Sequence, residues 1–389
     1  DLEGDYAFVI GRANDDKLYA FKKGSGMVIG IGDGFTCLSS DLPSILPLTR
    51  EVIRPQGGEI VTLWADRVEV RSVKDGKIIQ RMPETVTESM DAVQKGGYPH
   101  FMLKEIHEQA QVARELIHLL DGSPDVQPLV EKMKNARHLY LIGCGTSYHA
   151  AAVGSVYIAQ LAGRAAIPVL APQFIAQYAP AVGYEDVGIF VSQSGETKDV
   201  LNALEAAEKR GMACFGLANV VGSTLTKATS SCLPLCCGYE ISVPATKTFT
   251  NQVVTFLYLA YRMAGKDTSE LLRIPELMEQ TIEMVGPQIE VIAKDLNAHE
   301  WNDMYCLGYG ATYPIALEGA LKLKEITYAH CEGMLSTEFK HGPLSAVSKG
   351  FPIVFVAGPN DVPLIISDPD VRVGGTTTYQ ILVENKGTQ

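Results

Sequence analysis

A ten-residue pattern occurs twice in this chain and limits the folds that it can adopt. Residues 139–148 read LYLIGCGTSY, and residues 304–313 read MYCLGYGATY, 165 positions further along. In both copies an apolar, strand-like run leads into a Gly-x-Gly turn, and a hydroxyl residue and a tyrosine follow. Such self-similarity predicts two structural units of the same kind in tandem, the second beginning near Asn302.

Strand-like and helix-like runs alternate between residues 139 and 237, which is typical of a parallel, doubly wound α/β sheet. Long helical patterns follow at residues 246–264 and 274–296. In the second copy, residues 351–357 and 379–383 are candidates for later strands, and we expect the end of this unit to be truncated.

Two loops rich in glycine and hydroxyl residues follow predicted strands of the first copy, at residues 144–147 and 192–197. A glycine lets a ligand approach the backbone, and the start of the next helix offers unpaired N–H groups that suit a phosphate. Neither loop contains Lys or Arg, so neutral donors fit a sugar phosphate better than a nucleoside triphosphate. No Gly-Lys-Ser/Thr follows the glycines, which excludes a Walker A loop. Ordinary helix caps are the alternative interpretation.

The region before this α/β part is rich in short β-type runs, at residues 6–10, 18–21, 27–31, 59–63 and 68–70. We therefore expect a β-rich region over residues 1–73 and a polar linker over residues 74–100. An amphipathic helix is predicted over residues 101–120, with Lys104, Glu105, Glu108 and Gln109 at its polar positions. The first α/β domain with its flanking helices is assigned to residues 101–296, and the second to residues 297–389.

Composition excludes several classes of function. A formal net charge of −12 argues against a nucleic-acid surface, and no apolar run is long enough to span a bilayer. The acidic start does not resemble a signal peptide. The eight scattered cysteines predict reduced thiols and a cytoplasmic protein, and the cluster at Cys232, Cys236 and Cys237 lacks the further ligands of a metal site.

Two charged residues near the second copy suit proton transfer beside a carbonyl group. Lys322 and Glu325 are three residues apart on a predicted helix, so they share a face. A carboxylate base and a cation that stabilises an enediolate oxygen are what such a reaction needs. A surface ion pair is the alternative. His341 lies in a turn-like Lys-His-Gly-Pro sequence, which does not by itself indicate a catalytic role.

Taken together, the two loops and four further segments resemble the isomerising glutamine–fructose-6-phosphate aminotransferases, also called glucosamine-6-phosphate synthases. The four segments are residues 98–106, 240–250, 317–326 and 340–344. The resemblance implies two tandem flavodoxin-like sugar isomerase (SIS) domains, preceded by a β-rich remnant of an Ntn-type glutaminase domain. It also implies a cytoplasmic transferase of amino-sugar biosynthesis that converts fructose 6-phosphate to glucosamine 6-phosphate through aldose–ketose isomerisation.

The resemblance also assigns roles to residues. Glu325 moves the proton between C1 and C2, Lys322 assists it, and His341 opens the sugar ring in the site of the partner subunit of a homodimer. The backbone around Val243 touches the sugar. The substrates are fructose 6-phosphate, glucose 6-phosphate and glucosamine 6-phosphate, and neither a cofactor nor a metal is expected. The remaining substrate-binding residues are Cys144, Gly145, Thr146, Ser147, Ser192, Gln193, Ser194 and Thr197.

The sequence departs from the family pattern at three places. The chain begins with Asp1 rather than the nucleophilic cysteine of the glutaminase domain, so we do not expect it to hydrolyse glutamine. The family's C-terminal lysine motif has no match, and Ala245 stands where the family usually has serine. These departures leave open an alternative, a SIS module that binds a hexose phosphate without turnover. A nucleotide-binding α/β enzyme is a weaker third option, because no suitably placed acidic residue follows the Gly-x-Gly turn.

Overall fold

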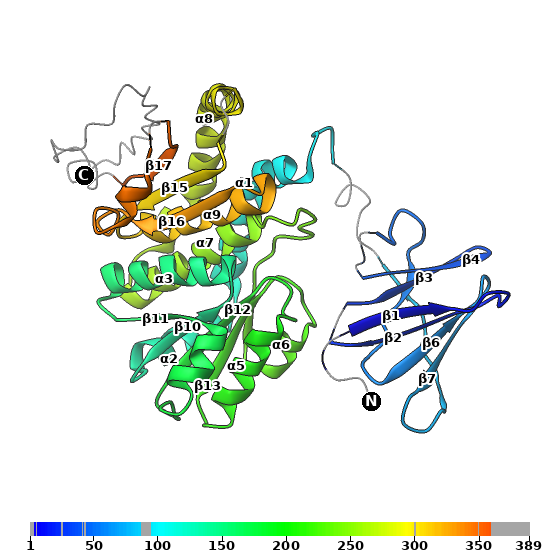
Figure 1. Ribbon diagram of the computed structural model, residues 1–389. Coiled ribbons are helices and arrows are strands. Elements are labelled where there is room, and N and C mark those ends of the chain that lie inside the picture. The colour runs from blue at the N-terminus through cyan, green and yellow to red at the C-terminus, as the bar shows by residue number, and fades with distance from the viewer. Residues whose placement is uncertain are drawn as a thin grey trace. The chain divides into compact units, whose positions relative to one another are not determined.

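The fold was analysed in a computed structural model, which describes residues 4–358 except 5, 25, 41, 43, 87–94, 299–300 and 349. The chain divides into two compact units, residues 1–100 and residues 101–389 (Figure 1). Each unit is described by itself below. The strand expected at residues 379–383 lies outside the described residues.

The first unit contains two antiparallel sheets. The larger sheet has, in spatial order, β1 (Tyr6–Gly11), β2 (Leu18–Lys23), β6 (Glu59–Leu63), β7 (Val68–Ser72) and β8 (Ile78–Ile79). The smaller has β4 (Phe35–Ser39), β3 (Val28–Gly32), β5 (Glu51–Ile53) and β9 (Glu84–Thr85). Apolar side chains from both sheets, among them Ala20, Ile29 and Val61, form one core.

The five β-type runs in the sequence all lie in strands of this unit, but its end differs from the expectation. The segment 74–100, interpreted above as a linker, contains the two-residue strands β8 and β9. These strands pair with β7 and β5, so the β-rich unit extends past residue 73. Strands this short form through pairing with a neighbour, and their own sequences carry no alternating pattern that predicts them.

The second unit contains the predicted parallel sheet. Its spatial order is β11 (Ile167–Leu170), β10 (Leu139–Gly143), β12 (Val187–Ser192), β13 (Ala213–Ala218) and β14 (Cys232–Pro234), and every neighbouring pair is parallel. In order of sequence the strands therefore run 2-1-3-4-5, the flavodoxin-like arrangement. This part of the expected fold is confirmed.

Helices cover both faces of this sheet, which explains why β10 and β12 are buried throughout. Leu139 and Leu141 point into the core on one face, and Tyr140 and Ile142 point into the core on the other. The first core is closed by α1 (Phe101–Gly122), α2 (Val126–Asn135), α3 (Thr146–Ala162) and α7 (Lys247–Ala264). The second is closed by α4 (Ala171–Gln173), the π-helical turn Phe174–Tyr178, α5 (Lys198–Glu208) and α6 (Thr224–Ala228).

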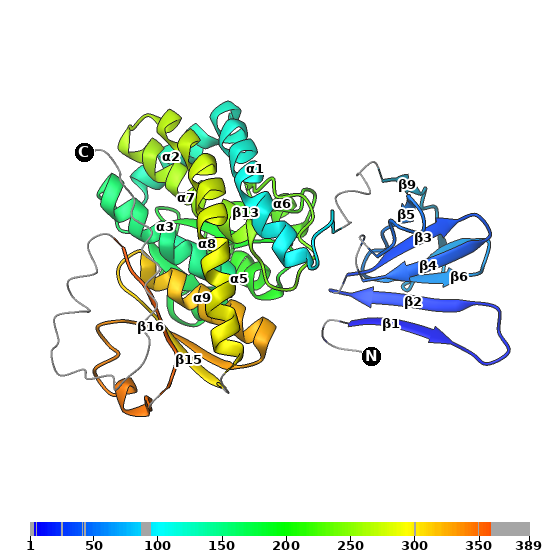
Figure 2. The ribbon, with the colours of Figure 1, turned by 90° about the horizontal axis from the view of Figure 1, so that it is seen from above.

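The second copy of the repeat forms a second parallel sheet with the order β16 (His330–Leu335), β15 (Asp303–Gly308) and β17 (Ile353–Val356). This is the same 2-1-3 order as the first three strands of the first copy. Helix α9 (Thr312–Thr327) follows β15 as α3 follows β10. A 3₁₀ turn (Thr268–Arg273) and α8 (Ile274–Asn297) join the copies, with α8 beside α1 (Figure 2), and another 3₁₀ turn spans Pro343–Ala346.

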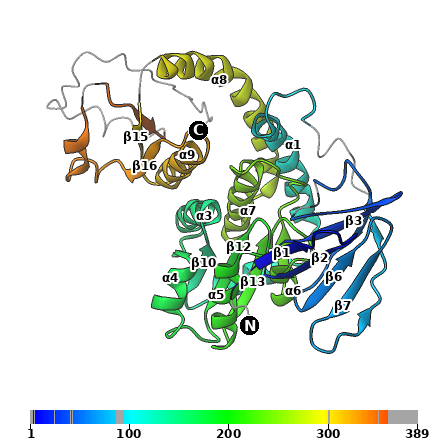
Figure 3. The same cartoon turned by 45° about the vertical axis from the view of Figure 1, so that its right-hand side comes forward.

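Helix α3 lies between the first sheet and helix α9 (Figure 3). A helix covered on two sides needs small and apolar residues all round, which agrees with the Ala-rich, weakly amphipathic sequence of α3. The helix that starts at the first glycine turn is therefore also the helix that meets the second copy of the repeat.

Helix α1 has the predicted extent, but two of its charged residues are not on the solvent face. Lys104 and Glu105, assigned above to polar positions, are 8% and 2% exposed. The binary pattern places charged residues outside, whereas here Glu105 accepts hydrogen bonds from the backbone of residues 241 and 242. A buried carboxylate is tolerated when such donors surround it.

One buried carboxylate ties the starts of two strands together. Asp186, which precedes β12, is fully buried and accepts hydrogen bonds from Arg137 Nε at 3.0 Å, Arg137 Nη2 at 2.6 Å and the Gly183 N–H at 2.8 Å. His138 Nδ1 lies 3.0 Å from the same carboxylate. Burial acts to raise the pKa of Asp186, but the hydrogen bonds from Arg137, Gly183 and His138 outweigh it and hold the pKa below its ordinary value.

We predict that Asp186→Asn lowers the free energy of unfolding at neutral pH by about 2 kcal/mol, because charge-assisted hydrogen bonds are lost. Since the pKa of Asp186 is lower in the folded state, this stabilisation is present above the unfolded pKa of about 4 and is lost as pH falls through the folded pKa. Urea unfolding from neutral to acid pH should show the two proteins converging at low pH. A gap that is independent of pH would contradict the assignment. Asp66→Asn, at an exposed aspartate beside Arg67, is the control.

Candidate functional site

The two glycine and hydroxyl loops lie side by side at the carboxyl edge of the first sheet. β10 and β12 are adjacent and parallel, with Ile142 opposite Phe190, so the loops that follow them leave the sheet at the same edge. The chain passes from β10 outward to β11 on one side and later to β12 on the other. The crevice between β10 and β12 is therefore the topological switch point, where open α/β sheets bind ligands.

The loop after β12 is closed by its own hydroxyl groups. Ser192 is 2% exposed; its Oγ accepts a hydrogen bond from the Gly195 N–H at 3.0 Å and shares another with Thr197 Oγ1 at 2.9 Å. Ser194 Oγ accepts from the Glu196 N–H at 3.1 Å. The backbone carbonyl of Gln193 accepts a hydrogen bond of 3.1 Å from the N–H of Asn219, the residue that follows β13. The predicted binding residues of this loop thus form one ordered turn in front of α5.

Gly195 is required by that turn. Its φ of +66° is in the left-handed region, and a Cβ on this residue would collide with the Ser223 side chain. A residue with a side chain at this position would be strained by its backbone conformation and would also displace the start of α6.

The loop after β10 places two hydroxyl groups in different surroundings. Ser147 is 7% exposed, and its Oγ accepts a hydrogen bond from Gln252 Nε2 of α7 at 3.1 Å. Thr146 Oγ1 donates to Glu318 Oε1 at 2.8 Å and accepts from Lys322 Nζ at 3.1 Å. Thr146, the first residue of α3, is therefore bonded to α9 of the second copy.

Helix α9 presents three charged side chains on one face, because Glu318, Lys322 and Glu325 are spaced by four and three residues. Lys322 Nζ lies 3.3 Å from Glu318 Oε1 and 2.7 Å from Glu325 Oε2. Glu318 is 5% exposed, and its second oxygen is 2.7 Å from His149 Nδ1 of α3. The structure thus brings together Lys322, Glu325 and the first loop, and the pair is not an isolated surface ion pair.

Sequence reasoning missed Glu318, His149 and Gln252. Glu318 carried a usable signal, since it lies four residues before Lys322 and seven before Glu325 and must share their face. His149 and Gln252 carried none, because only the packing of α3 against α9 and α7 makes them neighbours of the loops.

The other predicted site residues are placed differently. Val243 is 86% exposed in the irregular segment 239–246 between β14 and α7. His341 is exposed in the turn after β16, and within the described residues its side chain forms no hydrogen bond or ion pair. Gly145 has a φ of +51°. Burial raises the pKa of the Cys144 thiol, which favours the neutral thiol over a nucleophilic thiolate.

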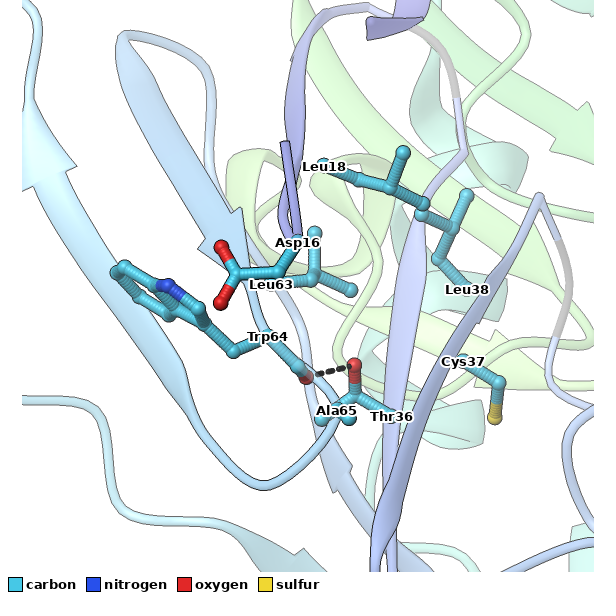
Figure 4. Close-up of a pocket in the computed structure, with 8 residues that line it drawn as sticks. All are labelled: Asp16, Leu18, Thr36, Cys37, Leu38, Leu63, Trp64 and Ala65. Atoms are coloured by element: carbon cyan, nitrogen blue, oxygen red, sulfur yellow. Dashed lines mark hydrogen bonds between the residues drawn. The ribbon is translucent and has the colours of Figure 1, made fainter. Parts of the chain in front are cut away.

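A separate hollow of about 420 Å³ lies in the β-rich unit (Figure 4). It is lined by residues of β2, β4 and β6 and the segments beside them, and Thr36 Oγ1 donates to the Trp64 carbonyl at its wall. Asp16 and Cys37 are its titratable residues, and burial raises the pKa of the Cys37 thiol. None of the residues predicted from the loops lines this hollow.

The described side chains and helices bear on metal binding and membrane insertion. Among the described side chains, no cluster of three or more His, Cys, Asp or Glu is arranged to hold a metal ion. None of the described helices is both long and apolar enough to cross a membrane.

Comparisons with known proteins agree with this architecture. The SIS domain model matches residues 132–262 and 299–363, one segment in each copy of the repeat. The glutamine–fructose-6-phosphate aminotransferase (isomerising) of Aquifex aeolicus is 37% identical over 92% of this chain. The chain spans about 60% of the length of that relative.

Two solved structures are also similar to this chain in fold and sequence. The C-terminal domain of glucosamine–fructose-6-phosphate aminotransferase from Francisella tularensis has a TM-score of 0.60 and 30% identity, covering 67% of this chain and 77% of that one. Glucosamine-6-phosphate deaminase from Thermotoga maritima has a TM-score of 0.57 and 26% identity, covering 68% and 80%. With its two matched segments on the two copies of one α/β unit, this chain belongs to the SIS domain family.

Proposed function

We propose that the second unit binds a hexose 6-phosphate and isomerises it, as the sugar part of a conversion of fructose 6-phosphate to glucosamine 6-phosphate. The observation that carries the proposal is the contact between the first loop and the charged face of α9. Thr146 of the loop is hydrogen-bonded to Lys322, which is paired with Glu325. A phosphate held by the loop would therefore place the rest of a short sugar phosphate near this pair.

The loops suit the phosphate group. Backbone N–H groups at the starts of α3 and α5 and the hydroxyl groups around them supply neutral donors, and both helix dipoles present their positive ends. The residues proposed to bind phosphate or sugar are Cys144, Gly145, Thr146, Ser147, Ser192, Gln193, Ser194, Thr197 and the backbone at Val243.

The charged face of α9 supplies the groups that we propose to transfer the proton. In the isomerisation, the Glu325 carboxylate takes a proton from C1 of the open-chain ketose. The electron pair of the broken C–H bond forms a C1=C2 double bond, and the π pair of the carbonyl group moves to the C2 oxygen to give an enediolate. Return of the proton to C2, with transfer of the C1 hydroxyl proton to the C2 oxygen, gives the aldose, and no further reactant is consumed. The Lys322 ammonium group is proposed to stabilise the enediolate oxygen.

In the aminating reaction, ammonia first condenses at C2 with loss of water, and the same proton then moves from C1 to C2. Glu318 is proposed to hold Lys322 and Thr146 in place in both reactions, since it contacts both side chains and is itself buried. It does not transfer the proton itself.

We further propose a homodimer in which His341 opens the sugar ring in the site of the partner subunit. The exposed position of His341, with no described contact to Glu325, supports a role in another subunit. For the β-rich unit we propose a glutaminase-type origin, and for the location the cytoplasm. The eight cysteines are all free, which supports a reducing compartment.

Exchange of the sugar protons tests the proposed reaction directly. In D₂O, the wild-type protein should replace protons of fructose 6-phosphate with deuterium, and NMR measures the rate of this replacement. We predict that Glu325→Gln lowers the exchange rate by about 10²–10⁴-fold, because the base is lost, while binding persists. Glu290→Gln removes a glutamate from an exposed i,i+4 Lys–Glu pair and should have no effect. Exchange that survives in Glu325→Gln would refute the role of Glu325, and binding without exchange in the wild type would favour the non-catalytic module.

The shape of the second loop can be tested by Gly195→Ala. The collision with Ser223 and the left-handed backbone should distort the loop, and the affinity for fructose 6-phosphate should fall at least about tenfold by calorimetry. Gly211→Ala carries a similar positive φ of +76° at a site with open space and should keep its affinity. Equal affinity of the two variants would contradict the proposed loop site.

The shared dimer site predicts complementation between two inactive variants. Glu325→Gln and His341→Asn should each abolish turnover alone. After the two are unfolded together and refolded, one site in each mixed dimer has both residues, so about a quarter of wild-type activity should return. Mixtures that stay inactive despite forming mixed dimers would place His341 outside the partner's site.

A further inference from the structure

The segment 239–246 has no regular secondary structure. It lies between β14 and α7, ends at the start of α7 and carries the highly exposed Val243. Such a segment has no ladder of backbone hydrogen bonds to hold it, so its N–H groups need partners from elsewhere.

Glu105 of α1 supplies those partners from a distant part of the chain. Its Oε1 accepts hydrogen bonds from the Ile241 N–H at 2.6 Å and the Ser242 N–H at 3.2 Å, and its Oε2 accepts from the Ser242 hydroxyl. Glu105 is 2% exposed, so these bonds replace most of the water that its carboxylate would bind. Bonds from N–H groups to a carboxylate are stronger than bonds between neutral groups.

A second carboxylate fixes the other side of Val243. Glu240 Oε1 accepts from the Thr246 N–H at 2.8 Å and the Thr248 N–H at 3.1 Å, and its Oε2 accepts from the Thr248 hydroxyl. These bonds satisfy N–H groups at the start of α7. Val243 thus lies between two carboxylates, Glu105 of α1 on one side and Glu240 of the segment itself on the other.

We propose that Glu105 is a positioning residue of the sugar site. By holding Ile241 and Ser242 it sets the backbone at Val243, and the first turns of α1 thereby shape a loop more than 130 residues away in the sequence. This inference rests on the proposed function, in which the backbone at Val243 contacts the sugar. Glu105 touches no reacting atom, so it acts on binding of the sugar and not on the proton transfer.

The helix itself does not depend on Glu105. Leu116, Ile117 and Leu120, later in α1, are fully buried in the main core and hold the helix against the sheet. Glu105→Gln keeps the size of the side chain but removes its negative charge, so the bonds from the Ile241 and Ser242 N–H groups lose their charge-assisted strength. The loop should be released while the helix stays in place.

The experiment compares wild type, Glu105→Gln and the control Glu115→Gln, an exposed glutamate on the same helix that is bonded to Gln111. Calorimetry with fructose 6-phosphate gives affinity, the amination assay with free ammonia separates KM from kcat, and hydrogen exchange reads the amides of residues 240–246. For Glu105→Gln we expect an affinity about tenfold weaker, a raised KM with kcat nearly unchanged, and faster amide exchange. Glu115→Gln should match wild type in all three.

Unchanged affinity and unchanged loop exchange in folded Glu105→Gln would overturn the inference, as would a loss confined to kcat. Failure of the wild type to bind fructose 6-phosphate would instead overturn the proposed function. Should Glu105→Gln fail to fold, Ser242→Ala removes the hydroxyl bonds to Glu105 and to the Pro244 carbonyl and keeps the two backbone N–H bonds to Glu105. It should shift affinity and loop exchange in the same direction by a smaller factor, and an unchanged Ser242→Ala would also count against the inference.

Discussion

The buried carboxylate of Glu318 is the contact on which the arrangement of the candidate site depends. It accepts from Thr146, lies against His149 and is paired with Lys322, so side chains from both α3 and α9 converge on it. A carboxylate in this position needs such partners, since an unpaired buried charge costs several kcal/mol. The requirement fixes how the first helix of one copy meets the first helix of the other (Figure 3).

The two copies of the repeat contribute unequally to the site. Both retain a strand, a turn with glycine at the strand end, and a helix that approaches it too closely for a side chain, as at Gly143 and Gly308. The first copy keeps the hydroxyl groups of a phosphate loop, whereas the second supplies the charged face of α9. This division explains why the phosphate-type loop and the proton-transfer pair are far apart in sequence but are joined through Thr146 and Lys322.

Much of the fold could be predicted, because its signals are local. The buried runs of β10 and β12, the glycine turns after them and the spacing of Lys322 and Glu325 are visible in the sequence. The features that could not be predicted from the sequence depend on contacts between distant parts of the chain. Glu105 was assigned to a polar face because the backbone groups that bury it lie more than 130 positions away. The spacing of Glu318 places it on the charged face of α9, but its contact with Thr146 is equally remote in sequence and is not visible there. Short strands such as β8 and β9 depend on their neighbours in the same way.

A double-mutant cycle between His149 and Glu318 tests most directly whether this contact joins the two copies. The free energy of unfolding would be measured for wild type, His149→Leu, Glu318→Gln and the double variant. The account predicts that the single losses do not add, with a coupling energy of about 1 kcal/mol or more, because each variant removes the same contact across α3 and α9. Losses that add within about 0.5 kcal/mol would contradict it, and the two copies would then be held together by other contacts.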